Sequence, residues 1–148
     1  MKILVLGATG LLGKAVFPTG SGLAGMFGGG APTYDAVMVA HTSFGSIGTV
    51  TAPYNLGRTL THELGHWLGL RHIWGDATCG DDYCNDTPTQ QTSNGGCPTF
   101  PSVTCGNSGD QSMNYMDYVN DACMYMFTSD QKARMDVVLT LSPQRTES

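Results

Sequence analysis

Several features that mark common protein classes are scarce in this sequence. Only 7 Lys and Arg face 12 Asp and Glu, and the net charge of −5 argues against a nucleic-acid partner, which needs a basic surface. No apolar run reaches the roughly 18 residues of a membrane span, so we expect no membrane partner. No two cysteines form C-x-x-C, which argues against a zinc ribbon or a thioredoxin-type redox pair. Glutamate is rare, since the chain holds only Glu63 and Glu147.

The residues that are present predict one compact domain. The chain has 148 residues, 41% of them hydrophobic, and its 20 glycines indicate many loops. Five cysteines lie in the polar second half and predict two disulfides with one spare thiol; the alternative is five reduced, buried thiols. Disulfides favour a secreted, extracellular protein, although Met1–Phe17 lack a small-x-small cleavage site and we expect no signal peptide there. We expect a monomer.

The first half of the chain predicts short elements separated by glycine. The apolar run at residues 3–6 predicts a buried strand, and residues 10–17 predict a short helix. A Gly-rich linker follows over 18–32. Residues 34–41 predict a second strand, and residues 42–51 predict an edge strand or hairpin.

The N-terminal glycines raise the alternative of a dinucleotide enzyme. Gly7, Gly10 and Gly13 fit G-x-x-G-x-x-G after an apolar strand. A dinucleotide site also needs a complete β–α–β unit and an acidic residue about 20 positions after the glycines. After Phe17 the chain becomes Gly-rich, its first acidic residue is Asp35, and the second βα unit is missing. An NAD(P)-binding fragment is therefore a remote alternative.

Two longer helices are predicted further along the chain. Residues 55–70 have helical periodicity, with Asn55 as the N-cap. The expected apolar face consists of Leu56, Leu60, Leu64, Trp67 and Leu68. Residues 73–112 predict a long irregular segment, which in a compact domain is usually functional or cross-linked. The sequence from Thr128 to Gln131 resembles a capping box that opens a last helix ending near residue 140.

The helix at 55–70 carries the most informative pattern, H-E-x-x-H-x-x-G-x-x-H. His62 and His66 lie one turn apart, so their imidazoles leave one face and can bind one Zn²⁺. Gly69 can turn the chain and return His72 to the metal as the third ligand. Glu63 follows the first ligand and is the expected general base for a water molecule in peptide hydrolysis. The alternative is an ordinary amphipathic helix with a polar face.

A second motif, SMNYMDY, fits the methionine turn that lies beneath the three histidines in metzincins. We predict Met116 as the methionine of this turn, with Met113 as the second candidate. The alternative is that the methionine is an ordinary core residue. Tyr118 could reach the metal or donate a hydrogen bond to the tetrahedral oxyanion, and we predict it as a second catalytic residue. A surface or core tyrosine is the alternative for Tyr118.

The chain resembles the pappalysin/cytophagalysin family of metzincin zinc metallopeptidases over roughly residues 20–140. The resemblance is carried by the two motifs above and by the stretches NLGRTLTHELGHWLGLRHIWGD, DDYCNDTP and YMFTSDQKARM. The resemblance implies a secreted zinc endopeptidase that acts on a peptide or protein substrate. The implied fold is α+β, a metzincin-like zincin. It has a small mixed sheet above the active-site helix and an irregular, disulfide-linked lower half that ends in a C-terminal helix. His62, His66 and His72 match the ligand positions, and Glu63 matches the base.

The resemblance also implies cross-links and a second metal. It pairs Cys79 with Cys105 and Cys97 with Cys123, whereas Cys84 could replace Cys79 or stay free. Some relatives bind calcium near the active site, and an acidic loop here offers oxygen ligands, with no ligand set assigned. Its carboxylates are Asp76, Asp81, Asp82 and Asp86, and a solvated acidic loop is the alternative.

The chain departs from the family at its start. Residues 1–17 resemble the beginning of an extended short-chain dehydrogenase, so the single domain of residues 1–148 combines an atypical start, the linker and a metzincin core at 33–148. A shortened upper half suggests an alternative function, zinc binding without catalysis. Substrate pairing is expected at an edge strand within Thr42–Val50. Asp121 lies just after the methionine turn, and we predict that it favours a basic residue after the scissile bond.

Overall fold

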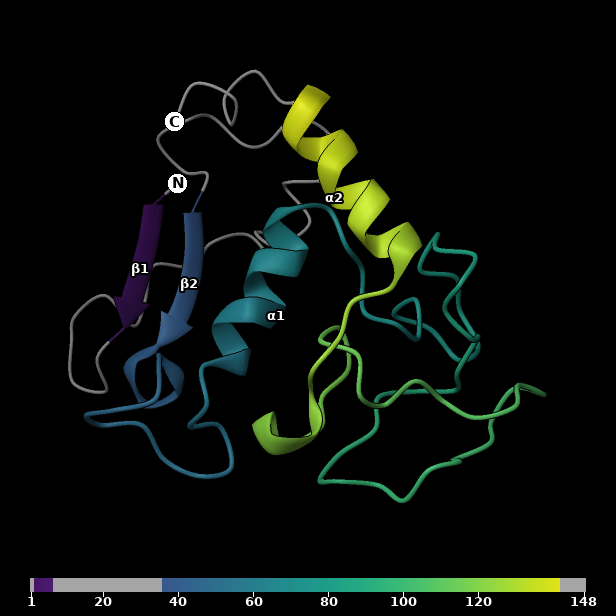
Figure 1. The fold of residues 1–148 in the computed structure, drawn as a ribbon, viewed down its shortest axis with the longest axis horizontal. Helices are drawn as coiled ribbons and strands as arrows, with labels where there is room; N and C mark the ends of the chain where they lie inside the picture. Colours follow the sequence, from purple (N-terminus) through teal and green to yellow (C-terminus); the bar gives the residue numbers. More distant parts are fainter. Residues whose placement is uncertain (1, 7–35, 142–148) are drawn as a thin grey trace.

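The computed structural model describes residues 2–6 and 36–141 (Figure 1). The predicted helix at 10–17 and the Gly-rich linker at 18–32 lie outside these residues. Strand β1 (Lys2–Leu6) pairs with strand β2 (Ala36–Ala40) in parallel, with Lys2 opposite Ala36 and Leu6 opposite Ala40. Both predicted strands are therefore confirmed. The described sheet consists of these two parallel strands and is not the mixed sheet that we expected.

The segment after β2 is not a strand, so the prediction of an edge strand or hairpin at 42–51 is wrong. A 3₁₀ turn, His41–Ser43, is followed by bends. Gly45 and Gly48 adopt φ of 85° and 89°, which an extended strand does not contain. The backbone N–H of Thr51 donates to the carbonyl of Thr42 at 3.1 Å and closes the segment into a loop. The edge strand expected within Thr42–Val50 is absent for the same reason, and substrate pairing at this segment stays a prediction.

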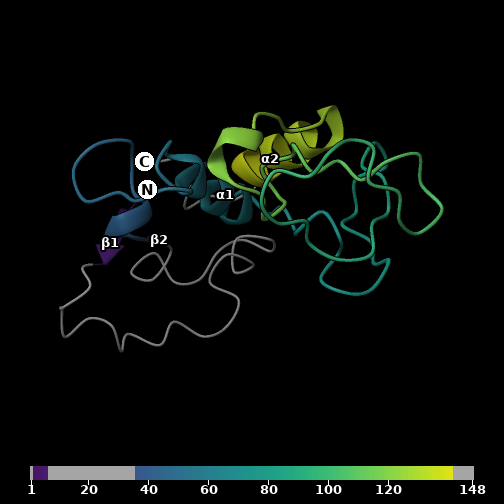
Figure 2. The ribbon, with the colours of Figure 1, turned by 90° about the horizontal axis from the view of Figure 1, so that it is seen from below.

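Helix α1 (Arg58–Trp67) lies between the sheet and the irregular second half of the chain (Figures 1 and 2). It begins later than predicted, because its N-cap is Gly57 at φ 77° and Asn55 does not cap it. The N–H groups of Leu56 and Arg58 instead donate to a carboxylate oxygen of Asp121, at 2.8 and 3.2 Å. A carboxylate from a distant segment thus takes the place of a local cap.

One face of α1 packs on the sheet and forms the first of two apolar clusters. Trp67 is buried with Val37 and Val39, and the leucines of the same helix face join them at Leu60, Leu64 and Leu68. Leu56 was expected on this face but precedes the helix, and its side chain is 50% exposed. The apolar stripe therefore fixes which side of α1 faces away from the sheet.

The end of α1 turns sharply, as predicted at Gly69. Gly69 adopts φ 87°, and its N–H donates to the carbonyl of His66 at 2.9 Å. The N–H of Leu70 donates to the carbonyl of Gly65 at 2.9 Å, which completes a Schellman motif. Leu70 then enters the second cluster with Ile73 and Met116, all nearly inaccessible to solvent. The turn thus sends the chain back beside the helix that it has just left.

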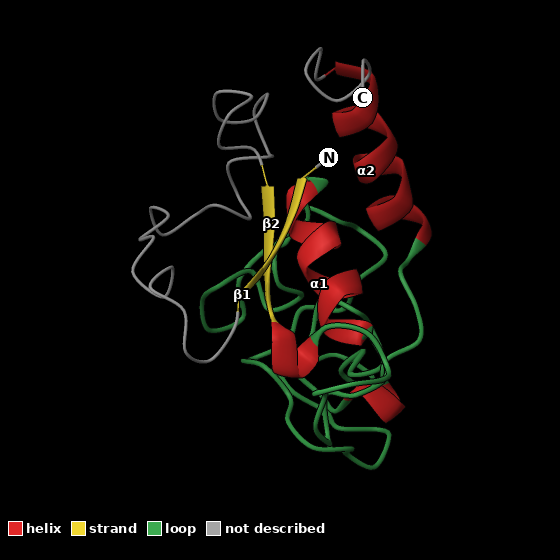
Figure 3. Ribbon diagram, turned by 90° about the vertical axis from the view of Figure 1, so that its left-hand side faces the viewer, coloured by secondary structure: helices red, strands yellow, loops and turns green. Residues whose placement is uncertain are grey.

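The second half is irregular, as Figure 3 shows, and is held by cross-links and buried polar groups. The disulfides are Cys79–Cys105 and Cys97–Cys123, the pairs implied by the resemblance, and Cys84 is free and buried. Asp117 is fully buried and accepts hydrogen bonds from Gln90 and Asn94. Such contacts satisfy the buried polar groups of this irregular segment and add to the apolar cluster around Met116.

Helix α2 (Ser129–Leu141) ends the described chain. The predicted capping box is confirmed, because the Gln131 N–H donates to Thr128 Oγ1 at 3.2 Å and the Thr128 N–H donates to Gln131 Oε1 at 2.9 Å. Gln131 also forms a pair of side-chain amide hydrogen bonds with Asn114. Across the described residues, no helix has the length and apolar composition needed to cross a membrane.

Candidate active site

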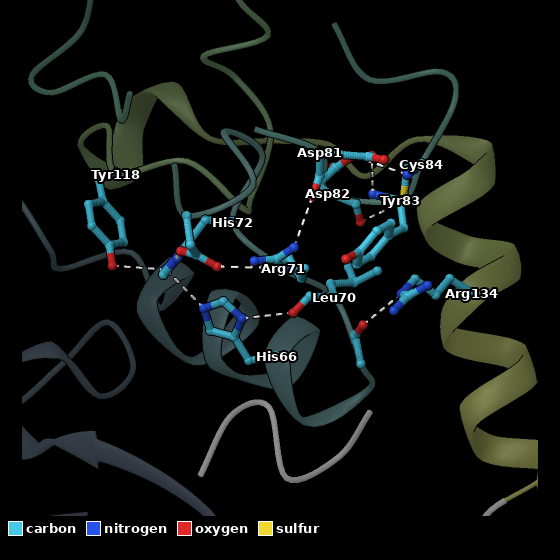
Figure 4. Close-up of polar contacts among 12 residues, drawn as sticks. His66, Leu70, Arg71, His72, Asp81, Asp82, Tyr83, Cys84, Tyr118 and Arg134 are labelled. Carbon is cyan, nitrogen blue, oxygen red and sulfur yellow. Dashed lines mark hydrogen bonds and ion pairs between the residues drawn. The ribbon is translucent and has the colours of Figure 1, made fainter. Parts of the chain in front are cut away.

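Three histidines meet where α1 turns back at Gly69. His62 and His66 come from α1, and His72 comes from the segment that follows Gly69. One ring nitrogen from each lies within 4.8 Å of the others, and the Nε2 atoms of His66 and His72 are 3.1 Å apart (Figure 4). In the described part of the chain, this is the one group of three or more His, Cys, Asp or Glu side chains that could hold a metal.

Each of these histidines has its Nδ1 atom bound to an oxygen. His62 Nδ1 donates to the carbonyl of Tyr115 at 2.6 Å, and His66 Nδ1 donates to the carbonyl of Leu70 at 2.9 Å. His72 Nδ1 donates to the carboxylate of Asp76. Because carbonyls and carboxylates only accept, the proton of each neutral ring sits on Nδ1. In a neutral ring held in this way, Nε2 is the nitrogen that is free to bind a metal.

This donor set fits a zinc ion. The Nε2 atoms of His66 and His72 face each other at 3.1 Å, close to the separation of two ligands of one ion. Two nitrogen ligands of one tetrahedral Zn²⁺ lie roughly 3.3 Å apart. Three imidazoles with fixed tautomers, and an open side for water, are the ligand set of a catalytic zinc site.

Burial keeps the α1 histidines neutral. Desolvation, together with repulsion from neighbouring imidazoles, lowers the pKa of His62 to about 3. Desolvation also lowers the pKa of His66, to about 4. Near neutral pH both rings are thus unprotonated, as a metal ligand must be. Burial raises the pKa of the Glu63 carboxyl, which brings it closer to the range of a general base working near neutral pH.

A cleft of about 580 Å³ opens over the histidines. Glu63, Tyr118 and Asp121 line it together with the three rings. The Tyr118 hydroxyl lies within hydrogen-bond distance of His72 Nε2, at 2.8 Å (Figure 4). Asp121 is 1% exposed, and its Oδ1 atom has no hydrogen-bond partner among the described residues. The wall of the cleft therefore contains a buried carboxyl oxygen whose hydrogen-bonding capacity is unused among the described residues.

Met116 lies beneath the histidine helix. Its side chain is 0% exposed, and a Cβ atom placed on Gly65 would come within 2.5 Å of its sulfur. The backbone of Met116 is held by the Asn114 side chain, whose Oδ1 accepts its N–H at 2.9 Å. The carbonyl of Met113, by contrast, accepts the N–H of Tyr125. The geometry thus favours Met116 over Met113 as the residue beneath the histidines.

The four aspartates suggested for calcium do not gather into one group. Asp76 contacts His72 and Arg71, whereas Asp86 accepts the N–H of Asp130. Asp81 accepts the N–H of Tyr83, and buried Asp82 accepts hydrogen bonds from Cys84 and Thr87. Calcium binding stays a prediction without a ligand set.

The sequence pattern predicted that the three histidines converge, but it did not predict which groups hold them. It did not indicate that Tyr115 and Leu70 would supply the carbonyls for His62 and His66, because every residue has a carbonyl. It assigned Asp76 to an acidic loop, although this carboxylate binds His72. An aspartate four residues after the third histidine was the available signal.

Comparison with known proteins identifies the family. The model of the M43 peptidase family, described as pregnancy-associated plasma protein-A, matches residues 12–140. This chain belongs to the M43 peptidases. An extracellular metalloprotease of Coccidioides posadasii is 39% identical over 127 residues, 85% of this chain and 44% of its own length. An extracellular metalloprotease of Colletotrichum graminicola is 38% identical over 138 residues, 91% of this chain and 48% of its own.

A solved metalloprotease structure has the same fold. Mature mirolysin of Tannerella forsythia, in complex with a cleaved peptide, matches with a TM-score of 0.73 and 47% identity, over 79% of this chain and 46% of that one. The chain thus spans about half the length of the relatives that it matches. The pappalysin resemblance is confirmed by these matches, and the dinucleotide alternative is not favoured.

Proposed function

We propose that this chain is the catalytic region of a secreted, zinc-dependent endopeptidase. The single observation that carries the proposal is the set of three imidazoles, with one ring nitrogen from each within 4.8 Å of the others, in a cleft that Glu63 also lines. Membership of the M43 peptidases supports hydrolysis of peptide bonds. Relatives named extracellular and the two disulfides support secretion.

The residues of this chain would divide the catalytic work among them. His62, His66 and His72 hold the ion, which when bound polarises a peptide carbonyl and lowers the pKa of water to about 7. The carboxylate of Glu63 takes a proton from the attacking water and passes it to the leaving amide nitrogen. The hydroxyl of Tyr118 leaves His72 and donates to the oxyanion that develops on the substrate. The buried Met116 side chain supports the histidines from below.

We further propose that Asp121 selects a basic residue just after the scissile bond. Its Oδ1 atom is buried in the cleft wall without a hydrogen-bond partner among the described residues, while Oδ2 is engaged by the start of α1. A Lys or Arg side chain that enters the cleft would supply that missing partner with an opposite charge. A peptide library cleaved by the full chain tests this, because equal cleavage before all residue types would contradict it.

The catalytic proposal is tested by comparing the full chain with Glu63→Gln on a fluorogenic peptide, with and without a chelator. The variant keeps the shape of the side chain but cannot accept a proton. We expect zinc content to be unchanged and the cleavage rate to fall by about 10²–10⁴-fold, the range of one general base. Chelator should abolish cleavage by the wild type, and added zinc should restore it.

Two outcomes would count against the proposal. Wild-type rates in Glu63→Gln would refute the mechanism. Zinc binding without any cleavage by the wild type would favour the alternative, a zinc protein without catalysis.

A further inference from the structure

We propose that Asp76 is a positioning residue that fixes the ring of His72 for metal binding, an inference that rests on the zinc site proposed above. The three histidines are held differently. His62 and His66 donate to backbone carbonyls, which come from Tyr115 and Leu70. His72 donates to a side-chain carboxylate, so its ring is the one among the three whose orientation a single substitution can release.

The backbone after His72 is shaped to bring this carboxylate back to the ring. Gly75 and Asp76 adopt positive φ angles of 66° and 59° in succession, and the Gly75 N–H donates to the carbonyl of His72 at 2.9 Å. Gly75 also sits against the backbone of Asp81, where an added Cβ would lie 2.3 Å from the Asp81 nitrogen. Aspartate is one of the few residues with a side chain that tolerates positive φ, which makes it suited to this position.

Arg71 holds the other side of the carboxylate. Its Nε atom lies 3.6 Å from Asp76 Oδ2, while Oδ1 accepts from His72. A terminal nitrogen of Arg71 donates to the carbonyl of Asp81 at 3.0 Å (Figure 4). The guanidinium thus ties Asp76 to the opposite side of its own loop, so that the carboxylate reaches the histidine with little freedom to rotate.

The same group of contacts extends to the turn at Gly69, which lies between the second and third histidines. The guanidinium groups of Arg71 and Arg134 lie 5.2 and 5.6 Å from the centre of the Tyr83 ring. Arg134, from α2, donates its Nε–H to the carbonyl of Gly69 at 2.7 Å. The segment that carries His72 is therefore held at both ends, at Gly69 and at Asp76.

Losing the carboxylate would leave the ring with contacts that do not fix it. The indole of Trp74 stacks on His72 at 4.3 Å between ring centres, with 7° between the planes, and a stacked ring can still turn in its own plane. Tyr118 binds Nε2, the atom that the metal requires. Asp76 is thus the contact that defines which nitrogen carries the proton. Removal of such a partner of a ligating histidine typically weakens metal binding about 10–100-fold.

The test compares Asp76→Gly, Asp76→Asn and a matched control, Asp81→Gly, in the full chain. Glycine removes the carboxylate at no cost to the backbone at φ 59°, and asparagine keeps an oxygen that can accept from Nδ1. The side chain of Asp81, in the same loop, accepts from Tyr83 and not from a histidine, and Asp81→Gly keeps the carbonyl that binds Arg71.

The zinc dissociation constant is measured by competition with a chromophoric chelator, and folding is checked by circular dichroism of the zinc-free proteins. Asp76→Ser, whose hydroxyl is too short to reach the ring, serves as a second deletion if the glycine variant does not fold.

We expect zinc to bind Asp76→Gly about 10–100-fold more weakly than the wild type, and Asp76→Asn within about fivefold of it. Asp81→Gly should bind zinc like the wild type. Equal affinity of Asp76→Gly and the wild type would overturn the inference, and so would equal weakening by the two glycine variants. Failure of the wild type itself to bind zinc would instead overturn the proposed function.

Discussion

Acidification of the zinc-free protein should destabilise it through His62 and His66. The folded protein holds the pKa of His62 at about 3 and that of His66 at about 4, against 6.5 for a free histidine. Because the folded pKa lies below the unfolded one, the unfolded chain binds the extra proton first. The contribution to stability is therefore complete above pH 6.5 and is lost as the pH falls from 6.5 towards the folded pKa.

The size of the effect follows from the width of that window. One pKa unit corresponds to about 1.4 kcal/mol, so lowering the pH from about 6.5 to about 5 costs about 2 kcal/mol for each histidine, or about 4 kcal/mol for the pair. This loss is a large fraction of the roughly 5–15 kcal/mol that typically stabilises a domain. The raised pKa values of Glu63, Asp82 and Asp117 act in the opposite direction as these carboxyls take up protons. A variant is therefore needed to isolate one histidine.

The variant is His62→Gln, which can still donate to the carbonyl of Tyr115. Urea unfolding of both proteins, with a chelator present, gives the free energy of unfolding between about pH 7 and about pH 5. The difference in the free energy of unfolding between wild type and variant should change by about 2 kcal/mol over this range, because the wild type loses more stability than the variant. A difference that does not vary with pH would refute the assignment of a neutral, buried His62. In saturating zinc the wild type should lose less stability, because bound metal holds the rings unprotonated.

Two further predictions concern the floor and the wall of the cleft. Gly65→Ala should lower the melting temperature and weaken zinc binding, because its Cβ would lie 2.5 Å from the Met116 sulfur. Overpacking of this kind costs about 1–3 kcal/mol. The higher helix propensity of alanine offsets about 1 kcal/mol of that cost. Gly95→Ala, where no atom lies within 4 Å, is the control, and equal melting temperatures for the two variants would contradict the close contact. Asp121→Asn should keep cleavage but lose any preference for Lys or Arg after the scissile bond, as read by mass spectrometry of library products; an unchanged preference would exclude Asp121 as its cause.

Local patterns predicted the parts of the fold that short-range physics decides. The capping box at Thr128 and the turn at Gly69 formed as expected, because both depend on backbone groups within a few residues. The convergence of His62, His66 and His72 was predictable for the same reason, since one helical turn and one glycine turn generate it.

Contacts between distant segments account for most of the errors. Asn55 was a plausible cap until Asp121, far along the chain, took the N–H groups at the start of α1. Asp76 belonged to an acidic cluster by spacing alone, and only the return of the chain at Gly75 brought it to His72. The error at residues 42–51 was local, because their β-rich ends suggested a strand although Gly45 and Gly48 bend that segment into a loop.

The oxygens that hold the three imidazoles come from three separate places, the exit of α1, the Met116 segment and the Asp76 loop. A newly made chain that has folded only α1 possesses two of the rings, with neither the Tyr115 carbonyl nor His72 in place. The site of three histidines is therefore complete only when distant parts of the molecule have assembled. A partly folded copy would lack the complete ligand set, so the proposed peptidase activity would be confined to fully assembled molecules.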